Sequence, residues 1–297
     1  MPYARSGTLR VYYESTGAGP AVLLVLGQGM ALESGWRTAE TLASKFRVLA
    51  FDHRDVGRSD RSLWPYAVSQ MARDAIAVLD AAGEPRAHVY GLSLGGMVAQ
   101  ELALSHPRRV GALVLGATTP GGAIALPQDP RALTFFARAG AMGHEEAEWA
   151  AVPYSYGERT RRHHGDRIAE DIARRLGVGT RGGGPLREAL ASVPDTFTYV
   201  HQVTAAASHL TLSRLRAIAA PTLVVHGAQD LIQSPDSARV LAGAIPGAEL
   251  RVWPEAGHLY PTDEPDADRE VARFLTRHAG ALGVAAPGED LAGFSPA

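Results

Sequence analysis

The fold is decided by residues 87–100, which read AHVYGLSLGGMVAQ. The apolar start of this stretch predicts a short strand and its end predicts a helix, with the pattern G-x-S-x-G at the turn between them. A turn this tight forces Ser93 into an unfavourable backbone conformation. It also leaves no room for side chains at Gly91 and Gly95. We therefore expect the Ser93 hydroxyl to stand exposed at the carboxyl edge of a sheet, above a helix N-terminus that favours negative charge.

Strand and helix patterns alternate on both sides of this turn. Apolar runs that end at glycine or at a polar turn predict strands, and apolar residues at helical spacing predict helices. The expected strands are Thr8–Glu14, Ala21–Leu26, Phe46–Phe51, Ala87–Tyr90, Val110–Leu115, Thr222–His226 and Ala248–Trp253; the expected helices are Trp36–Ser44, Met71–Leu79, Leu94–Ser105, Ser234–Ala244 and Asp268–His278. This rhythm predicts an α/β fold with a mostly parallel central sheet flanked by helices.

The alternation stops after Thr118 and resumes at Pro221. The residues between them are helical and irregular in pattern and contain no convincing strand. We interpret residues 120–208 as a helical cap inserted into one α/β core, which residues 1–119 and 209–280 form. The Ala-, Gly- and Pro-rich residues 281–297 are expected to be a flexible tail.

The composition excludes several kinds of site. The 297 residues carry 29 Lys and Arg against 31 Asp and Glu, a net charge of −2, so no surface for nucleic acid is expected. The absence of cysteine excludes disulfides, thiolate zinc sites, iron–sulfur clusters and cysteine nucleophiles. No cluster has metal-ligand spacing, and neither a metal nor a cofactor is expected. Without a bilayer-length apolar run or a signal-peptide pattern, we expect a cytoplasmic protein with no membrane partner.

A serine hydroxyl needs a base, and the base needs an acid that orients it. His258 directly follows the last predicted strand, and Asp230 lies in the loop after the preceding strand. Because parallel strands end at one edge of a sheet, we expect Ser93, Asp230 and His258 to meet there as a catalytic triad.

Two other histidines lie at the ends of predicted strands. His226 ends the strand before Asp230, and we interpret it as structural. His53 is followed by Arg54 and Asp55, and we interpret it as part of an ion-pairing turn.

A tetrahedral intermediate needs two backbone N–H donors. We expect one from Leu94, which follows the serine, and one from Gln28, in the loop Gly-Gln-Gly-Met after the strand predicted to end at residue 26. The neighbouring Gly29 and Met30 are expected to contact the substrate.

The same loop has a second interpretation. Gly27-x-Gly29 follows a strand, and Asp52 lies 23 residues beyond Gly29, as in a partial dinucleotide-binding fingerprint. Leu32 occupies the third glycine position, where a side chain would obstruct helix–strand packing. The fingerprint also leaves the serine, acid and histidine unexplained, so we prefer the oxyanion interpretation.

With these motifs the chain resembles the α/β-hydrolase superfamily over nearly its whole length. The triad order of serine, acid and histidine is that of the fold. Residues 51–59, FDHRDVGRS, look like the D-x-R-G-x-G-x-S turn of the family, with Asp55 in place of the first glycine. The D-H-R-D-x-G-R-S form is similar to aclacinomycin methylesterase-like polyketide esterases, and the core is equally similar to 3-oxoadipate enol-lactonases. Many members carry His-Gly where this chain has Leu26-Gly27, a histidine that the methylesterase-like group also lacks.

The residues and the resemblance together predict a serine hydrolase. It would cleave a carboxylic ester or lactone of a small, largely apolar substrate, such as a polyketide or other natural product, through an acyl-enzyme. One alternative is a natural-product enzyme that uses the same triad for acyl transfer, C–C cleavage, elimination, cyclisation or perhydrolysis. Another is a non-catalytic small-molecule receptor on the same fold.

The cap is expected to set specificity because it would cover the strand ends. The candidate pocket residues are Trp36, near Met30 at the rim, and the cap aromatics Phe135, Phe136, Trp149, Tyr154, Tyr156, Phe197 and Tyr199. The arginine-rich residues 159–167 could attract an anionic substrate or a carrier protein. Apart from the small-molecule substrate, we expect a monomer or a homodimer.

Overall fold

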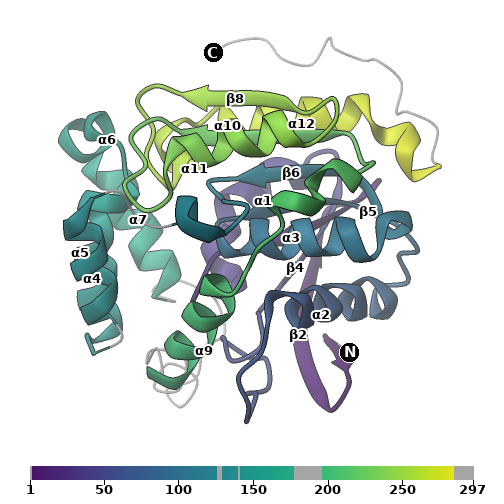
Figure 1. Ribbon diagram of the computed structural model, residues 1–297, viewed down its shortest axis with the longest axis horizontal. Coiled ribbons are helices and arrows are strands. Elements are labelled where there is room, and N and C mark those ends of the chain that lie inside the picture. The colour runs from purple at the N-terminus through teal and green to yellow at the C-terminus, as the bar shows by residue number, and fades with distance from the viewer. Residues whose placement is uncertain (1, 126–128, 140, 177–195, 284–297) are drawn as a thin grey trace.

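The computed structural model describes residues 2–125, 129–139, 141–176 and 196–283 (Figure 1). Within these ranges eight strands form one sheet in the order β1-β2-β4-β3-β5-β6-β7-β8. The strands are β1 (Tyr3–Ser6), β2 (Leu9–Thr16), β3 (Ala21–Val25), β4 (Arg47–Phe51), β5 (Ala87–Leu92), β6 (Val110–Gly116), β7 (Thr222–Gly227) and β8 (Glu249–Trp253). Only the pairs β1–β2 and β2–β4 are antiparallel. The predicted mostly parallel sheet is therefore confirmed.

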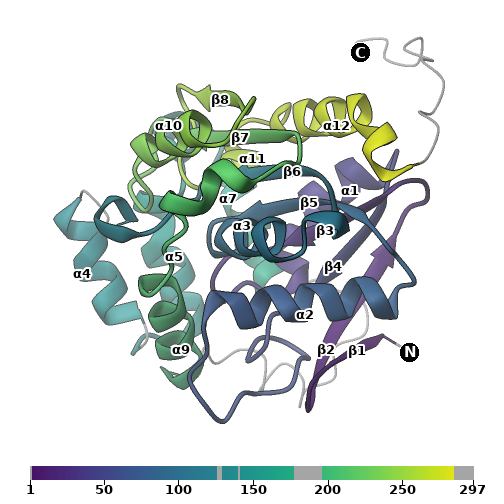
Figure 2. The ribbon, with the colours of Figure 1, turned by 45° about the vertical axis from the view of Figure 1, so that its right-hand side comes forward.

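Helices cover both faces of this sheet (Figures 1 and 2). On one face, α2 (Val68–Ala81), α3 (Leu94–Ser105) and α10 (Pro235–Ala244) pack in one apolar cluster with residues of the central strands. On the other face, α1 (Trp36–Ala43) and α12 (Ala267–Arg277) pack in a second cluster. The central strands β3, β5, β6 and β7 are buried along their whole length, which explains their unbroken apolar runs.

Further helices lie between β6 and β7 in the chain. They are α4 (Pro130–Ala139), α5 (His144–Ser155), α6 (Glu158–His163), α7 (Gly165–Arg175) and α9 (Thr196–Ala207). In Figures 1 and 2, α4, α5 and α9 lie together at one side of the sheet. Part of the expected cap, residues 126–128, 140 and 177–195, lies outside the described residues, as do residues 284–297 of the expected tail.

Several short elements were not predicted. The strand β1 forms a hairpin with β2 through a turn at Gly7, and α11 (Tyr260–Asp263) follows the loop after β8. The 3-10 helices are Leu32–Gly35, Pro107–Arg109, Gly122–Ala125, Leu212–Ala217 and Ala279–Leu282. Elements this short carry too few residues for a periodic pattern.

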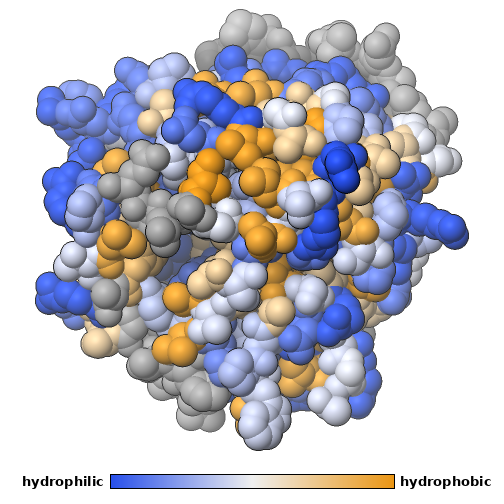
Figure 3. Space-filling view, viewed as in Figure 1, coloured by the Kyte–Doolittle hydropathy of each residue, from blue (hydrophilic) through white to orange (hydrophobic). Residues whose placement is uncertain are grey.

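The surface is mixed in character. In the view of Figure 3, hydrophobic side chains gather near the middle of the molecule and hydrophilic ones around its periphery. None of the described helices is both long enough and apolar enough to cross a lipid bilayer.

A buried carboxyl group joins α12 to the sheet. Asp268 accepts hydrogen bonds from the hydroxyls of Thr38 (2.7 Å) and Tyr90 (3.2 Å), and Tyr90 in turn hydrogen-bonds to Tyr260. Burial, opposed by the hydrogen bonds from Thr38 and Tyr90, raises the pKa of Asp268 to about 6. The folded chain therefore holds a proton here that the unfolded chain releases near pH 4.

This raised pKa predicts a pH dependence of stability. The contribution of Asp268 is fully present below the unfolded pKa and is lost as the pH rises through about 6. Relative to the native chain, Asp268→Asn should therefore gain on the order of 1 kcal/mol in free energy of unfolding between about pH 5 and about pH 7.5. Denaturant titrations of both proteins at the two pH values measure this change. A difference that stays constant with pH would show that Asp268 does not titrate in this range.

Candidate active site

The turn at Ser93 has the strain that its sequence predicts. Ser93 joins β5 to α3 with φ 55° and ψ −119°, in the left-handed half of backbone space. A Cβ on Gly91 would lie 2.3 Å from the carbonyl oxygen of Gly95, and a Cβ on Gly95 would lie 2.0 Å from that of Val25. Both positions therefore exclude any residue other than glycine, and the serine is presented where β5 ends.

The loops after β7 and β8 bring Asp230 and His258 together. The Nδ1 atom of His258 lies 2.7 Å from Oδ2 of Asp230, so an Nδ1–H group donates to the carboxylate. The other oxygen, Oδ1, accepts the backbone N–H groups of Ile232 and Gln233, each at 2.8 Å. These bonds fix the carboxylate, which in turn fixes the imidazole and leaves its Nε2 available as a base.

A second histidine contacts the same carboxylate. Nε2 of His226 lies 3.1 Å from Oδ2 of Asp230 and 3.0 Å from the carbonyl oxygen of Gln233. Burial opposes ionisation of Asp230, but the charge of His258 and the hydrogen bonds from His226 and His258 outweigh it. The pKa of Asp230 is thereby held well below its usual range. This contact was not predicted, although the sequence places a histidine four residues before the acid.

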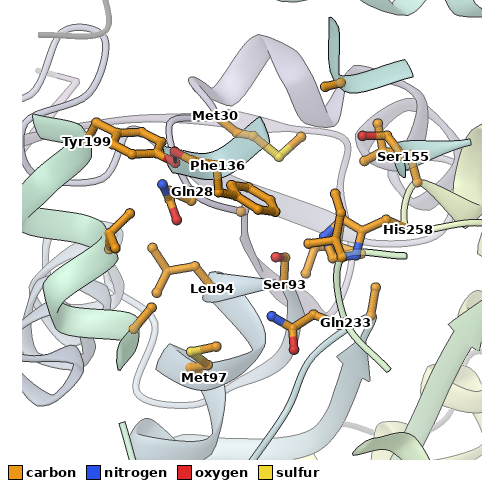
Figure 4. A pocket seen from close by; sticks show the side chains of 18 of the residues that line it. Gln28, Met30, Ser93, Leu94, Met97, Phe136, Ser155, Tyr199, Gln233 and His258 are labelled. Carbon is orange, nitrogen blue, oxygen red and sulfur yellow. Dashed lines mark hydrogen bonds between the residues drawn. The ribbon is translucent and has the colours of Figure 1, made fainter. Parts of the chain in front are cut away.

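Ser93 and His258 line one cavity of about 580 Å³ (Figure 4). Most of its wall is apolar and comes from α3, α4, α5 and α9 as well as the strand ends. The polar residues of the wall are Gln28, Ser93, Glu148, Ser155, Arg175, Tyr199, Gln233 and His258. Such a space accommodates a small organic molecule of limited polarity.

The loop after β3 borders the serine. A Cβ on Gly27 would lie 3.4 Å from that of Ser93, and both Gln28 and Leu94 line the cavity. Among the described residues, no acceptor takes the backbone N–H of Gln28 or of Leu94. Both N–H groups are therefore available to a ligand.

The predicted substrate-contacting residues divide into two groups. Met30 and Phe136 line the cavity, as does the cap aromatic Tyr199. The wall does not include Gly29, Trp36, Phe135, Trp149, Tyr154 or Tyr156, and the side chain of Phe197 lies outside the described part of the chain.

Local packing explains why some of these residues lie outside the wall. The guanidinium groups of Arg37 and Arg174 each lie 4.4 Å from the centroid of the Trp36 ring. On α5 the residues that face the cavity are Glu148, Ala151 and Ser155, which share one face of the helix. Trp149 and Tyr154 fall on other faces: Trp149 is 48% exposed, and Tyr154 stacks on Phe135 at 5.3 Å.

Two polar residues of the cavity wall belong to an ion pair. Nε of Arg175 lies 2.7 Å from the carboxylate of Glu148, and its Nη2 donates to the hydroxyl of Tyr156 at 2.9 Å. This ion pair was not predicted, because its members lie on different helices, α5 and α7, and no local sequence pattern connects them.

His53 lies in an ion-pairing turn, as its sequence neighbours indicate, and its own ring makes a hydrogen bond there. Its Nε2 lies 2.9 Å from the carbonyl oxygen of Leu26, and burial lowers its pKa. The ion pairs of this turn join Arg54 to Asp74 and Arg58 to Asp52. Burial of the ring away from water favours the neutral imidazole.

The arginine-rich residues 159–167 do not line the cavity. Arg159 pairs with Glu255 and Glu264, and Arg162 pairs with Glu158. In the part of the chain that the structure describes, no group of three or more His, Cys, Asp or Glu residues is placed to hold a metal ion.

Known proteins are similar to this chain in sequence and in architecture. The family model described as alpha/beta hydrolase fold matches residues 20–165. A relative from Azorhizobium caulinodans, named "Putative carbamate hydrolase RutD", is 32% identical over 91% of this chain and 96% of its own.

Two solved structures are also similar. One is the enol-lactonase from Burkholderia xenovorans LB400, with a TM-score of 0.76 and 25% identity over 93% of this chain and all of the other. The other is described as an N-acyl homoserine lactone degrading enzyme, with a TM-score of 0.72 and 28% identity over 92% of this chain and 99% of its own.

Proposed function

The chain belongs to the α/β-hydrolase fold family, and from this premise we propose that it is a serine hydrolase of carboxylic esters or lactones. The observation that carries the proposal is one cavity whose wall contains both Ser93, on its strained turn, and His258, which is held by an ionised Asp230. A hydroxyl, an imidazole and a carboxylate in this relation are the parts that acyl transfer needs. The relatives named for carbamate or lactone hydrolysis are consistent with a reaction at a carbonyl carbon.

Each group has a defined role in the proposed reaction. Ser93 Oγ attacks the carbonyl carbon while His258 Nε2 accepts its proton. Asp230 orients the imidazole and stabilises it while it is charged. The N–H groups of Gln28 and Leu94 donate to the oxyanion that forms. His258 then protonates the leaving alcohol, and the acyl-enzyme remains.

Water completes the cycle. His258 takes a proton from a water molecule, which attacks the acyl-enzyme, and then gives that proton to Ser93 Oγ as the acid is released. When the substrate is a lactone, acid and alcohol leave as one hydroxy acid, because the leaving oxygen is tethered to the acyl chain. The same cavity therefore serves both substrate types.

The cavity wall also supports a substrate preference. Helices from residues 120–208, the proposed cap, supply apolar wall residues such as Leu133, Phe136 and Val203. We therefore propose that the cap selects a small, largely apolar acyl or alcohol group, as found in many natural-product esters. A panel of esters and lactones graded by chain length and polarity tests this preference through kcat/KM.

Turnover in ¹⁸O-labelled water tests the reaction itself. Hydrolysis requires one labelled oxygen in the acid product, which mass spectrometry detects. Acyl transfer to another alcohol or to peroxide gives a different product, and unlabelled acid from a turned-over ester would contradict the proposed hydrolysis.

A further inference from the structure

Helix α9 contacts the sheet-bearing part of the chain through three polar side chains. Thr198 donates from Oγ1 to the carbonyl oxygen of Asp55 at 3.2 Å, and His201 Nδ1 lies 3.3 Å from the Asp55 carboxylate. One position further on, Gln202 reaches a different loop: its Oε1 accepts the backbone N–H of Gly29 at 2.7 Å. Of these three, Gln202 alone joins α9 to the loop that carries Gln28.

This loop has a turn type that can be identified. The N–H of Met30 donates to the carbonyl oxygen of Gly27 at 3.3 Å, which closes a four-residue turn. Gly29, at its third position, has φ +68°, whereas Gln28 is not among the residues with positive φ. These are the dihedral signs of a type II turn, in which the third residue needs the left-handed region.

The hydrogen bond from Gly29 selects this turn type. Types I and II differ chiefly by a flip of the central peptide, here the one between Gln28 and Gly29. Gln202 accepts the N–H of that same peptide. A flip would turn the Gln28 carbonyl oxygen toward Gln202 Oε1 and would break this hydrogen bond.

The side chain of Gln202 is fully buried, so its amide has been removed from water. Burying an amide costs free energy unless it makes hydrogen bonds, and an apolar residue of similar size would fill the space without that cost. The bond to Gly29 offsets the cost for Oε1 only, since Nε2 is buried without a hydrogen-bond partner among the described residues.

We propose that Gln202 is a positioning residue: its hydrogen bond to Gly29 tethers the Gly27–Met30 turn to α9 and thereby holds the neighbouring Gln28 N–H in place for the oxyanion. This inference rests on the proposed hydrolase function. Gly29 and Gln202 are 173 residues apart in sequence. The position of the second oxyanion donor, the Gln28 N–H, therefore depends on how α9 docks.

Replacement of Gln202 by methionine tests the inference, because methionine keeps the length of the side chain and removes the acceptor. Loss of a whole oxyanion donor costs about 10²–10³ in kcat, so misplacing one should cost roughly ten- to a hundredfold, with KM nearly unchanged. A boronic acid that forms a tetrahedral anion on Ser93 should lose affinity by the same factor as kcat/KM. A planar ketone analogue should bind as it does to the native enzyme.

Thr198→Val is the matched control, since it removes one of the two contacts of the same helix with Asp55 and leaves the bond to Gly29. We expect native kcat and native boronate affinity for it. Gln202→Glu keeps an acceptor oxygen and should recover most of the kcat that Gln202→Met loses. If the methionine variant does not fold, the test of Gln202 rests on the glutamate variant. A folded glutamate variant without turnover contradicts the inference.

The outcomes separate the inference from the function on which it rests. A native enzyme that hydrolyses esters, together with a folded Gln202→Met variant of native kcat and boronate affinity, overturns the role of Gln202 alone. A native enzyme without any ester or lactone turnover overturns the proposed function.

Discussion

Ser93→Ala is expected to lower kcat for an activated ester by about 10⁴-fold or more, because it removes the nucleophile on which the acyl-enzyme depends. The residual rate should be that supplied by binding and by the oxyanion donors. The variant should fold normally, since alanine keeps the Cβ that serine already carries at φ 55°. Initial rates with a nitrophenyl ester, together with an unfolding curve, measure both effects.

A serine outside the cavity provides the control for this variant. Ser208 donates to the carbonyl oxygen of Ala205 and does not line the cavity, so Ser208→Ala should retain native turnover. Near-native hydrolysis by Ser93→Ala would refute the role of Ser93 as the nucleophile.

Asp230→Asn should lower kcat by about 10⁴-fold, the loss known for the equivalent change in a serine protease triad. The amide oxygen can still accept the N–H groups of Ile232 and Gln233, so the loop is preserved. Its NH₂ group then faces Nδ1 of His258, which must become the acceptor. The imidazole proton moves to Nε2, where it prevents the ring from accepting the proton of Ser93.

The matched control lies six residues further along the chain. Asp236 is exposed and pairs with Arg239, so Asp236→Asn should leave kcat unchanged. Native pH dependence and turnover within tenfold of native for Asp230→Asn would show that His258 does not depend on this carboxylate.

Much of the sheet and the placement of Ser93, Asp230 and His258 could be predicted because local rules govern them. Gly91 is required by a contact within the turn and Gly95 by the carbonyl oxygen of Val25 on the neighbouring strand β3, and strand ends converge whatever lies between them in sequence. Each of these signals occupies a few neighbouring residues. The sequence therefore predicts where these side chains lie without knowledge of the helices around them.

The cavity wall could not be predicted in the same way. Which face of α5 meets the cavity depends on how the helix docks. The prediction relied on aromatic rings and therefore named Trp149 and Tyr154, whereas Glu148 and Ser155 line the cavity. Likewise, only the tertiary structure shows that Gln202 meets Gly29.

The departure at Asp55 from the glycine of the family's turn has a structural explanation. Asp55 adopts φ +70°, a conformation that disfavours side chains. Its carboxylate accepts the backbone N–H of Ser62 and contacts His201 on α9. These contacts offset the backbone strain, and a glycine could not make them.

Covalent labelling of Ser93 tests the central claim most directly. After exposure to a fluorophosphonate, intact mass spectrometry and peptide mapping should find one adduct per chain, on Ser93. The adduct should form much more slowly in Asp230→Asn and be absent in Ser93→Ala. A native enzyme that turns over esters but remains unlabelled, or that is labelled on another residue, would contradict the account.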